Sequence, residues 1–373
     1  MRCLKRTILI AVCSTVLSHT FAVAQVKQPS KLFSVLVNEK VGFIDTDGKM
    51  VIAPQFQGAG DFVEGRAFVA VSGDKYKLGY IDEAGSFIVP AQFDAARDFS
   101  EGLAAVGIGN FGIHGEGNHK WGFIDRDGRF AIEPKFKEVK AFSEDLAAVM
   151  NEHGKWGFID RNGKLAIPYN FDDAFSYSEG LACVMINGLF GFIDKSGNVV
   201  IEPRYLLPSK FKEGLAPVKT GKFNEKPYRF YGTYIAPEGQ FAFIDMSGKA
   251  AFTLGTEVKR VNSFSEGLAL VAVATKHGFP FYGYIDRAGK MAIEPKYFGF
   301  ALDFSEGLAL ISVKDKIGFI DKTGKIVIKP EFSYGTSFRN GLAAVEKGKT
   351  AADFKAPNLY IDRSGTIIWR LRK

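Results

Sequence analysis

The stretch Gly122-Phe123-Ile124-Asp125-Arg126-Asp127-Gly128 contains a motif, Gly-Phe/Tyr-Ile-Asp-x-x-Gly, that recurs along the chain. The aspartate of the motif is found at positions 45, 82, 125, 160, 194, 245, 286, 321 and 362. The closing glycine is found at positions 48, 85, 128, 163, 197, 248, 289, 324 and 365. The nine copies are about 40 residues apart on average, and this period indicates one structural unit repeated in tandem.

Each copy contains three short apolar segments, which we name A, B and C. Segment A is Leu-Ala-Ala-Val at 103–106, segment B is Trp-Gly-Phe-Ile-Asp at 121–125, and segment C is Val-Val-Ile at 199–201, followed by Glu-Pro. Segments of this length that are rich in Val, Ile, Phe and Ala predict strands. Asp-x-x-Gly between B and C predicts a tight hairpin, because Asp accepts a hydrogen bond from an N–H two residues on and Gly adopts a positive φ. We expect the proline after segment C to end strand pairing, since it has no N–H to donate.

A shared connector follows each segment C, as in residues 90–102 and 330–341. It carries two phenylalanines, at 93 and 99, at 136 and 142, and at 332 and 338. A three-stranded unit cannot bury enough apolar surface alone, so units of this kind are stabilised by stacking on their neighbours. The connector phenylalanines are therefore predicted to fill the seam between adjacent units.

These residues carry a family resemblance. Lys-Trp-Gly-Phe-Ile-Asp at 120–125 and 155–160, Ile-Glu-Pro-Lys-Phe at 132–136 and Phe-Ser-Glu-Gly-Leu-Ala at 264–269 and 304–309 resemble the WG (Trp-Gly) repeats of bacterial proteins. Only two copies keep the Trp; six others have Val41, Leu78, Phe190, Phe241, Tyr282 or Ile317 at that position, and the last copy has Asn358. The Gly is replaced by Ala242 in one copy and by Leu359 in another. The resemblance implies an interaction or binding scaffold and not an enzyme.

The predicted fold is an all-β tandem array of nine three-stranded units. The units lie near residues 32–65, 66–102, 103–145, 146–180, 181–214, 215–267, 268–307, 308–341 and 342–373. The array starts on a segment A (34–37) and ends on a segment C (366–370), so its ends show no strand exchange that would close a ring. The sequence therefore favours an open, curved array of β-hairpins, with a closed ring similar to a β-propeller as the alternative.

Residues 1–24 have the layout of a cleavable signal peptide. Arg2, Lys5 and Arg6 precede an apolar run at 8–17, and Ala22-Val23-Ala24 predicts cleavage after Ala24. We therefore expect residues 25–373 to be secreted or periplasmic, with no transmembrane segment. The expected mature chain keeps 45 Lys and Arg against 41 Asp and Glu, scattered singly, which argues against a nucleic-acid partner. Cys183 is its only cysteine and is predicted to be a small buried hydrophobe.

No catalytic or cofactor motif occurs in the sequence. His114 and His119 share one loop without a Cys or carboxylate cluster beside them, so they are predicted to be solvated and not to bind a metal. The recurrent Ser-Glu-Gly, as at 100–102, carries a Glu in each copy. An active site needs unlike groups that converge once, whereas a turn repeats like groups, so no enzymatic activity, cofactor or metal is expected.

The repeat is interrupted at one place in four of its copies. The connection from segment A to segment B is expanded at 103–122, 215–242, 268–283 and 342–359, and insertions of this kind project from one face of an array. The aromatic and polar residues predicted to bind a protein or glycan partner there are Phe111, His114, Phe223, Tyr228, Arg229, Phe230, Tyr231, Phe281 and Tyr282. Two alternatives stay open: the insertions are tolerated surface loops, or the array is a structural or assembly protein of the cell envelope that stacks through its strand edges.

Overall fold

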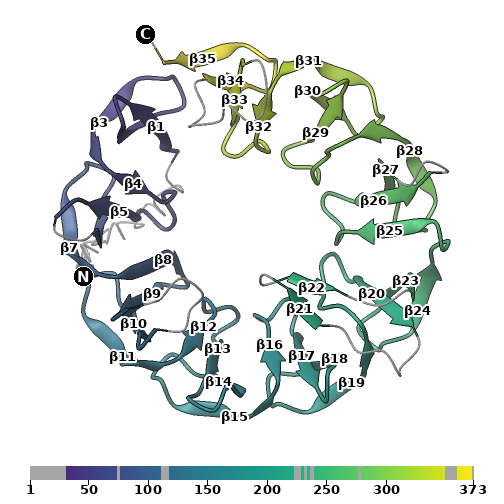
Figure 1. Ribbon diagram of the computed structural model, residues 1–373, viewed down its shortest axis with the longest axis horizontal. Helices are drawn as coiled ribbons and strands as arrows, with labels where there is room; N and C mark the ends of the chain where they lie inside the picture. The colour runs from purple at the N-terminus through teal and green to yellow at the C-terminus, as the bar shows by residue number, and fades with distance from the viewer. Residues whose placement is uncertain are drawn as a thin grey trace, which may run out of the picture.

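The described residues form a closed ring of nine antiparallel β-sheets with three or four strands each (Figure 1). The computed structural model describes residues 31–73, 76–110, 117–221, 228–230, 233–235, 239–275, 279–348 and 359–371. The expected signal peptide lies outside these residues. Within the described ranges every regular element is a strand, and none contains a helix that is long and apolar enough to cross a membrane. We number the sheets as blades 1 to 9 in chain order.

All three predicted segments form strands in every blade, and their bounds are as follows. The A strands are β1 (Phe33–Val37), β5 (Ala67–Val71), β9 (Leu103–Ile108), β13 (Ala147–Met150), β17 (Ala182–Ile186), β20 (Ala216–Gly221), β26 (Ala269–Ala274), β29 (Leu308–Val313) and β33 (Leu342–Glu346). The B strands are β2 (Lys40–Ile44), β6 (Lys77–Ile81), β10 (Lys120–Ile124), β14 (Trp156–Ile159), β18 (Leu189–Ile193), β23 (Gly239–Ile244), β27 (Pro280–Ile285), β30 (Lys316–Asp321) and β34 (Leu359–Asp362). The C strands are β3 (Met50–Phe56), β7 (Phe87–Phe93), β11 (Phe130–Phe136), β15 (Leu165–Phe171), β19 (Val199–Tyr205), β24 (Ala250–Thr253), β28 (Met291–Phe298), β31 (Ile326–Phe332) and β35 (Ile367–Arg370).

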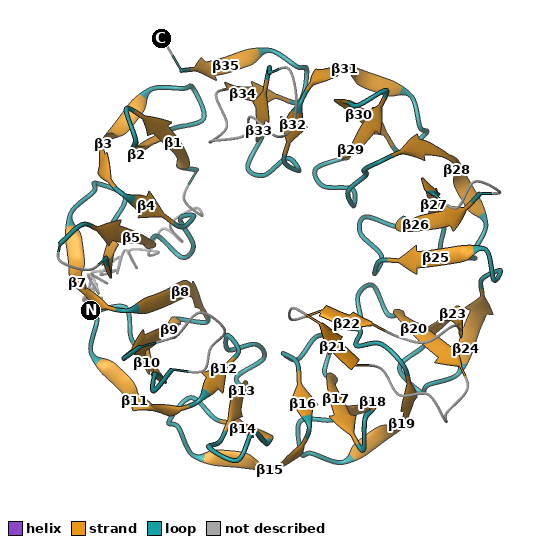
Figure 2. Cartoon of the chain, in the orientation of Figure 1, coloured by secondary structure: helices purple, strands orange, loops and turns teal. Residues whose placement is uncertain are grey.

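A fourth strand, absent from the sequence-based prediction, joins six of the described blades. It lies inside the connector and pairs with strand A, as where Glu138 and Val139 pair with Met150 and Val149. These inner strands are β4 (Gly58–Ala59), β8 (Ala95–Ser100), β12 (Glu138–Val139), β16 (Asp173–Ala174), β25 (Val258–Val261) and β32 (Tyr334–Gly335). The C strands form the outer rim of the ring (Figure 2).

The proline of the C strands does not end strand pairing, so that prediction was wrong. Pro134 lies within β11, which continues to Phe136 and pairs it with Trp121 of β10. Strand C is the outer edge of its sheet, and an edge position needs no N–H donor on its free side. Seven of the nine C strands contain a proline, which protects these edges against pairing with other chains.

The Asp-x-x-Gly hairpin forms as predicted. In the copy at Asp160, the Oδ1 atom accepts the N–H groups of Asn162 and Lys164 at 2.9 and 3.0 Å, and Gly163 has a φ of 76°. A Cβ atom on Gly163 would lie 3.1 Å from the Ile132 side chain of the preceding blade. The turn therefore closes one blade and covers the core of its neighbour.

The glycine of the Trp-Gly pair is required by a close approach of two strands. A Cβ atom on Gly122 would lie 2.6 Å from the carbonyl oxygen of Ile132 in β11, where the register shifts at a bulge. Blade 6 has Ala242 at this position and a different third strand. Its β24 ends at Thr253, which pairs with Ala242. Losing the glycine therefore goes with losing the first of the two register shifts, while the shift between Phe243 and Ile244 remains.

The connector aromatic residues fill the seams between blades, as predicted. Phe142 lies in the connector that leads into blade 4. It packs edge-on against Phe123 of blade 3, with ring centroids 4.9 Å apart. Both rings belong to one buried cluster that combines residues of the two blades, such as Trp121 and Val149. The same contact recurs around the ring in the pairs Phe43–Phe62, Tyr80–Phe99, Phe158–Tyr177, Phe192–Phe211, Phe243–Phe264, Tyr284–Phe304 and Phe319–Phe338.

The Ser-Glu-Gly turns link each blade to the next through the glutamate. The N–H groups of Glu213 and Gly214 donate to the carboxylate of Glu179 at 2.7 and 2.8 Å. Glu179 has a φ of 56°, a left-handed conformation that costs an L-residue about 1 to 2 kcal/mol, and the bonds to the next blade offset this strain. The same carboxylate contact joins Glu64 to Gly102, Glu101 to Glu144 and Asp145, Glu144 to Gly180, Glu213 to Gly267, Glu266 to Gly307, and Glu306 to Gly341.

Blades 1 and 9 pack against each other, so the closed ring is confirmed and the preferred open array was wrong. Phe33 and Val35 of blade 1 share a buried cluster with Leu342 and Tyr360 of blade 9. The Tyr360 hydroxyl donates to the carbonyl oxygen of Ser34 at 2.7 Å. Each of the two sheets contains strands from its own end of the chain only, so the absence of strand exchange was predicted correctly. Side-chain packing closes the ring in place of a shared strand.

Two single-residue predictions have opposite outcomes. Cys183 is buried as expected, and burial raises the pKa of its thiol to about 12. His119 is not a solvated loop residue as predicted. It is only 5% exposed, and its Nε2 atom lies 3.1 Å from the carbonyl oxygen of Lys137. The connection after β9 therefore returns this ring into the blade.

Truncating an aromatic side chain in a seam between blades is expected to lower the stability of the whole propeller. Phe304 is 2% exposed and packs on Tyr284 of the preceding blade, so Phe304→Ala should lower the free energy of unfolding by about 3 to 5 kcal/mol. Phe87, which is 47% exposed, provides the control Phe87→Ala with a much smaller loss. Chemical denaturation measures the free energy of unfolding of both variants. A loss of less than about 1 kcal/mol for Phe304→Ala would contradict the seam packing.

Acid should destabilise the fold through its carboxylate turns. Burial raises the pKa of Glu266, but the Lys322 ammonium and the Gly307 N–H outweigh it and hold that pKa below its usual range. The side chain and N–H of Asn198 likewise lower the pKa of Asp194. A depressed pKa in the folded state stabilises above the ordinary pKa, and this contribution is lost as the pH falls.

The melting temperature is therefore expected to be nearly constant down to about pH 4.5, the ordinary pKa of Glu, and to fall below it. Glu266→Gln should make that fall shallower, because the residue at 266 then no longer titrates. Calorimetric scans across this range measure both effects. A melting temperature that is the same at neutral and strongly acidic pH would contradict the assignment.

Candidate functional site

The antiparallel order of the blades gives the ring two different faces. Strand A begins at the Ser-Glu-Gly turn and strand B ends at the Asp-x-x-Gly turn, so both turns lie at the same edge of the ring. We name this edge the turn face. The connections from A to B and the corners after strand C lie at the opposite edge, which we name the loop face. The expanded connections predicted from the sequence therefore share one face.

The turn face is internally paired. Its glutamates, in addition to the backbone bonds, form ion pairs with cations of the Asp-x-x-Gly turns, as between Glu64 and Arg126 at 2.6 Å and between Glu266 and Lys322 at 3.1 Å. Three more pairs of this type are Glu101–Arg161, Glu144–Lys195 and Glu213–Arg287. These charged groups serve the fold, which directs the search for a binding site to the loop face.

The predicted binding residues divide into three groups. Phe111, His114, Phe223 and Tyr231 lie outside the described residues. Tyr228, Arg229 and Phe230 form β21 (Tyr228–Phe230), which pairs with β22 (Thr233–Ile235). The longest interruption of the repeat thus contains a β-hairpin, inserted between β20 and β23 of blade 6. Phe281 and Tyr282 lie next to each other near the start of β27 in blade 7.

Phe281 and Tyr282 differ in their surroundings. Tyr282 occupies the Trp position of the repeat, pairs with Tyr297 and packs against the buried cluster around Tyr284. Phe281 lies one residue closer to the loop face and pairs with Phe298, with ring centroids 5.5 Å apart. Tyr282 is therefore mainly a core residue, and Phe281 belongs to the surface beside it.

An exposed aromatic patch surrounds Phe281. Phe279 is 66% exposed, and Phe298 and Phe300 are each 46% exposed. The Phe279 ring lies edge-on to Phe298 at 6.1 Å. We name Phe279, Phe281, Phe298 and Phe300 the blade 7 patch. Large apolar side chains gathered on a surface mark an interaction site, so this patch is the strongest candidate on the loop face.

Sequence reasoning missed Phe298 and Phe300 because connector aromatics were assigned to the seams. A signal was present, since this connector reads Tyr-Phe-Gly-Phe at 297–300 where another reads Phe-Asp-Ala-Ala at 93–96. The two additional aromatics follow the residue that fills the seam position. Phe298 is the last residue of β28, which has eight residues where most C strands have seven, and Phe300 lies on the corner after it.

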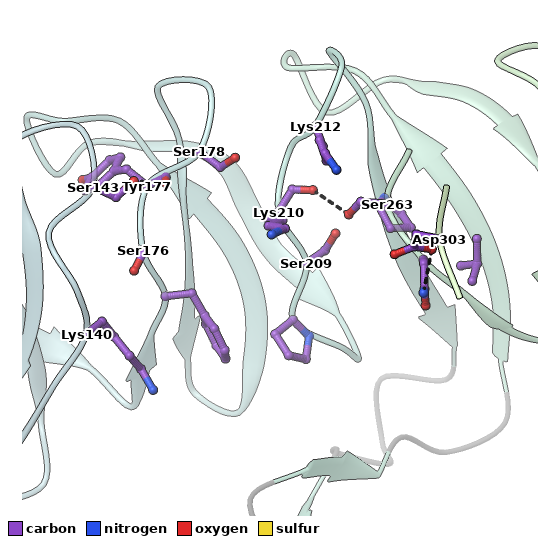
Figure 3. Close-up of a pocket in the computed structure, with 15 residues that line it drawn as sticks. Lys140, Ser143, Ser176, Tyr177, Ser178, Ser209, Lys210, Lys212, Ser263 and Asp303 are labelled. Atoms are coloured by element: carbon purple, nitrogen blue, oxygen red, sulfur yellow. Dashed lines mark hydrogen bonds between the residues drawn. The ribbon is translucent and has the colours of Figure 1, made fainter. Parts of the chain in front are cut away.

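A cavity of about 780 Å³ lies elsewhere, at the inner ends of blades 4 to 8 (Figure 3). Lys140, Lys210 and Lys212 line it together with several serines. The sequence signal for it was the connector at 205–213, which has a lysine on each side of the seam residue Phe211. No group of three or more His, Cys, Asp or Glu side chains in the described ranges is placed to hold a metal ion.

Nine blades arranged around one axis define a repeat β-propeller. The model of the WG-containing repeat matches residues 42–76, 79–110, 121–156, 156–190, 190–222, 282–316 and 317–350. These matches cover well over half of the sequence, and the chain belongs to the WG-containing repeat family. The unmatched stretch between 222 and 282 contains the copy in which Ala242 replaces the glycine.

Comparisons of whole chains add little to this. A search of curated proteins finds no significant match. The fold is similar to the crystal structure of BamB from Moraxella catarrhalis, with 12% identity and a TM-score of 0.42, over 91% of this chain and 98% of that one. It is also similar to a eukaryotic initiation factor, with 12% identity and a TM-score of 0.45, over 79% of this chain and 94% of that one. Because both TM-scores are low, the propeller architecture rests on the blades themselves.

Proposed function

We propose that the protein is a secreted, non-enzymatic scaffold that captures a protein partner on its loop face. The observation that carries this function is the blade 7 patch, whose members Phe279, Phe298 and Phe300 are 66%, 46% and 46% exposed. Secretion is supported by the signal-peptide layout of residues 1–24. The absence of enzymatic activity is supported by the structural use of the repeated carboxylates in turns.

A protein fits the patch better than a glycan does. The rings of Phe279 and Phe298 meet edge-on, with an interplanar angle of 81°, and so do not form one flat platform for a sugar ring. Phenylalanine offers no hydroxyl group to a saccharide, whereas aromatic rings are enriched at the centres of protein interfaces. The hairpin connection of blade 6 adds Lys222, Lys226 and Arg229 in sequence, which favour an acidic partner surface.

An assembly role through the outer rim is the second candidate. Several C strands begin with exposed apolar residues, among them Val51 at 43%, Phe87 at 47% and Val327 at 42% exposure. The prolines within seven C strands act against it, because they remove donors from the edges that would have to pair. Capture on the loop face is therefore the better-supported function.

The test compares two double variants, each with two phenylalanines replaced, for their capture of partner proteins from cell-envelope extract. The double variant Phe279→Ser and Phe298→Ser should lower capture of the native partner by about tenfold or more, since removing clustered aromatic anchors costs most of an interface's affinity. The matched control, Phe87→Ser and Phe130→Ser, changes exposed rings on the outer rim and should leave capture unchanged. Melting curves establish that all variants are folded.

A second variant tests the neighbouring blade. Replacing residues 222–233 with a short Gly/Ser turn is expected to weaken capture and to leave the melting temperature nearly unchanged. Unaltered capture by the blade 7 variant would contradict the assigned site. Loss of capture in the rim control alone would support the assembly role instead.

A further inference from the structure

We propose that the cavity at the inner ends of blades 4 to 8 binds an acidic saccharide, a sugar that bears carboxylate groups. The cavity has a volume of about 780 Å³, within the range typical of small-molecule sites (Figure 3). It is lined by connector residues and by Pro217 at the start of β20, and so lies apart from the loop face. The proposal is independent of the function assigned above.

Two prolines of blade 6 line the cavity. In blade 5, Ala174 of the inner strand pairs with Val184, and the Phe175 N–H donates to the carbonyl oxygen of Cys183 at 3.0 Å. The residues at the positions of Ala174 and Cys183 in the next copy are Pro208 and Pro217. Both prolines line the cavity, and the described sheet of blade 6 consists of β20, β23 and β24 without an inner strand. The connector still bonds to β20, since the Leu206 N–H donates to the carbonyl oxygen of Lys219 at 2.9 Å, and residues 208–210 after it line the cavity.

The charge of the cavity wall is positive. Lys140, Lys210 and Lys212 face one acidic residue of the lining, Asp303, whose carboxylate accepts a hydrogen bond from Asn262 at 3.0 Å. The Lys212 ammonium donates to Ser265 at 3.2 Å, and the Lys140 ammonium lies 5.8 Å from the centre of the Phe175 ring. These contacts hold two of the cations in place at the wall, where they favour negatively charged groups of a ligand.

The hydroxyl groups of the wall indicate a ligand that also supplies hydrogen-bond donors. Ser143 and Ser178 donate to the carbonyl oxygens of Tyr177 and Phe211 at 2.8 and 2.7 Å, so their oxygen lone pairs are left to accept bonds from a ligand. Ser209 differs from them, because its hydroxyl oxygen is buried and has no hydrogen-bond partner in the described structure. Buried polar groups are normally satisfied, and rotation of the Ser209 side chain about χ1 would bring its hydroxyl to the cavity, where a ligand hydroxyl is a suitable partner.

A saccharide meets these requirements better than a peptide does. An extended peptide would bind by adding a strand to the open edge of β20, through main-chain hydrogen bonds. Pro217 on that edge has no N–H to offer, which disfavours strand addition. Recognition is left to ammonium and hydroxyl side chains. A sugar acid presents carboxylates to the ammonium groups and hydroxyl donors to the serine hydroxyl groups.

The experiment is calorimetric titration of the chain without residues 1–24 with a trisaccharide of galacturonic acid. Binding that weakens with added salt is expected, and the neutral galactose trisaccharide should not bind. The double variant Lys210→Gln and Lys212→Gln should weaken binding by about a hundredfold, since two charge-assisted contacts are lost. The matched control Lys290→Gln and Lys329→Gln changes two exposed lysines of blades 7 and 8 and should bind as the parent does.

Ser209→Ala separates hydroxyl recognition from charge. It should weaken binding of the trisaccharide about threefold to tenfold and should not lower the melting temperature, because the hydroxyl has no partner to lose. Equal binding of citrate or of hexaglutamate would overturn the proposal in favour of a general anion site or a peptide site. Unchanged binding by the Lys210 and Lys212 variant would also overturn it. Capture of the protein partner by the blade 7 patch is measured separately and does not depend on these results.

Discussion

The ring depends on the aromatic side chain that each connector inserts into the preceding blade. A sheet of three or four short strands has too little surface to bury a core of its own. The edge-on contact of Phe142 with Phe123, repeated around the ring, joins such sheets in pairs, and every buried cluster therefore includes residues of two blades. Other features follow from this arrangement, since the glutamate of each Ser-Glu-Gly turn and the glycine of each Asp-x-x-Gly turn also reach across a seam.

The two faces of the ring divide structure from proposed function. Glutamates of the turn face are used in bonds to the next blade, and they are further paired with Arg126, Arg161 and similar cations. Few charged groups of the turn face are therefore left to bind a partner. The loop face carries connections of variable length on a framework that these bonds hold in place, and an exposed aromatic patch on blade 7. Among the described blades, blade 6 combines the loss of the repeat glycine with an inserted hairpin and a sheet that has no inner strand.

The features that the sequence predicted are those encoded within one copy of the repeat. The hairpin at Asp160, the three strands and the burial of Phe142 each depend on a few adjacent residues, and the structure contains them. Closure was not predictable in this way, because it depends on the angle accumulated over nine blades and on the contact of Phe33 with Tyr360. Four of the six inner strands have only two residues, which is too short to give a periodic signal. Of the binding residues, Phe281 lies in the exposed patch, whereas Phe298 and Phe300 were concealed by the expectation that connector aromatics fill seams.

The most direct test of this account is a distance measured across the closure. Spin labels at positions 47 and 364 mark equivalent turn residues of blades 1 and 9, and labels at 323 and 364 mark the same residues of the adjacent blades 8 and 9. Cys183, the one cysteine after residue 24, is buried and is not expected to react with the label. A ring closed by side-chain packing predicts that double electron–electron resonance gives similar distances for the two pairs. A much longer distance between 47 and 364 than between 323 and 364 would contradict the closed ring.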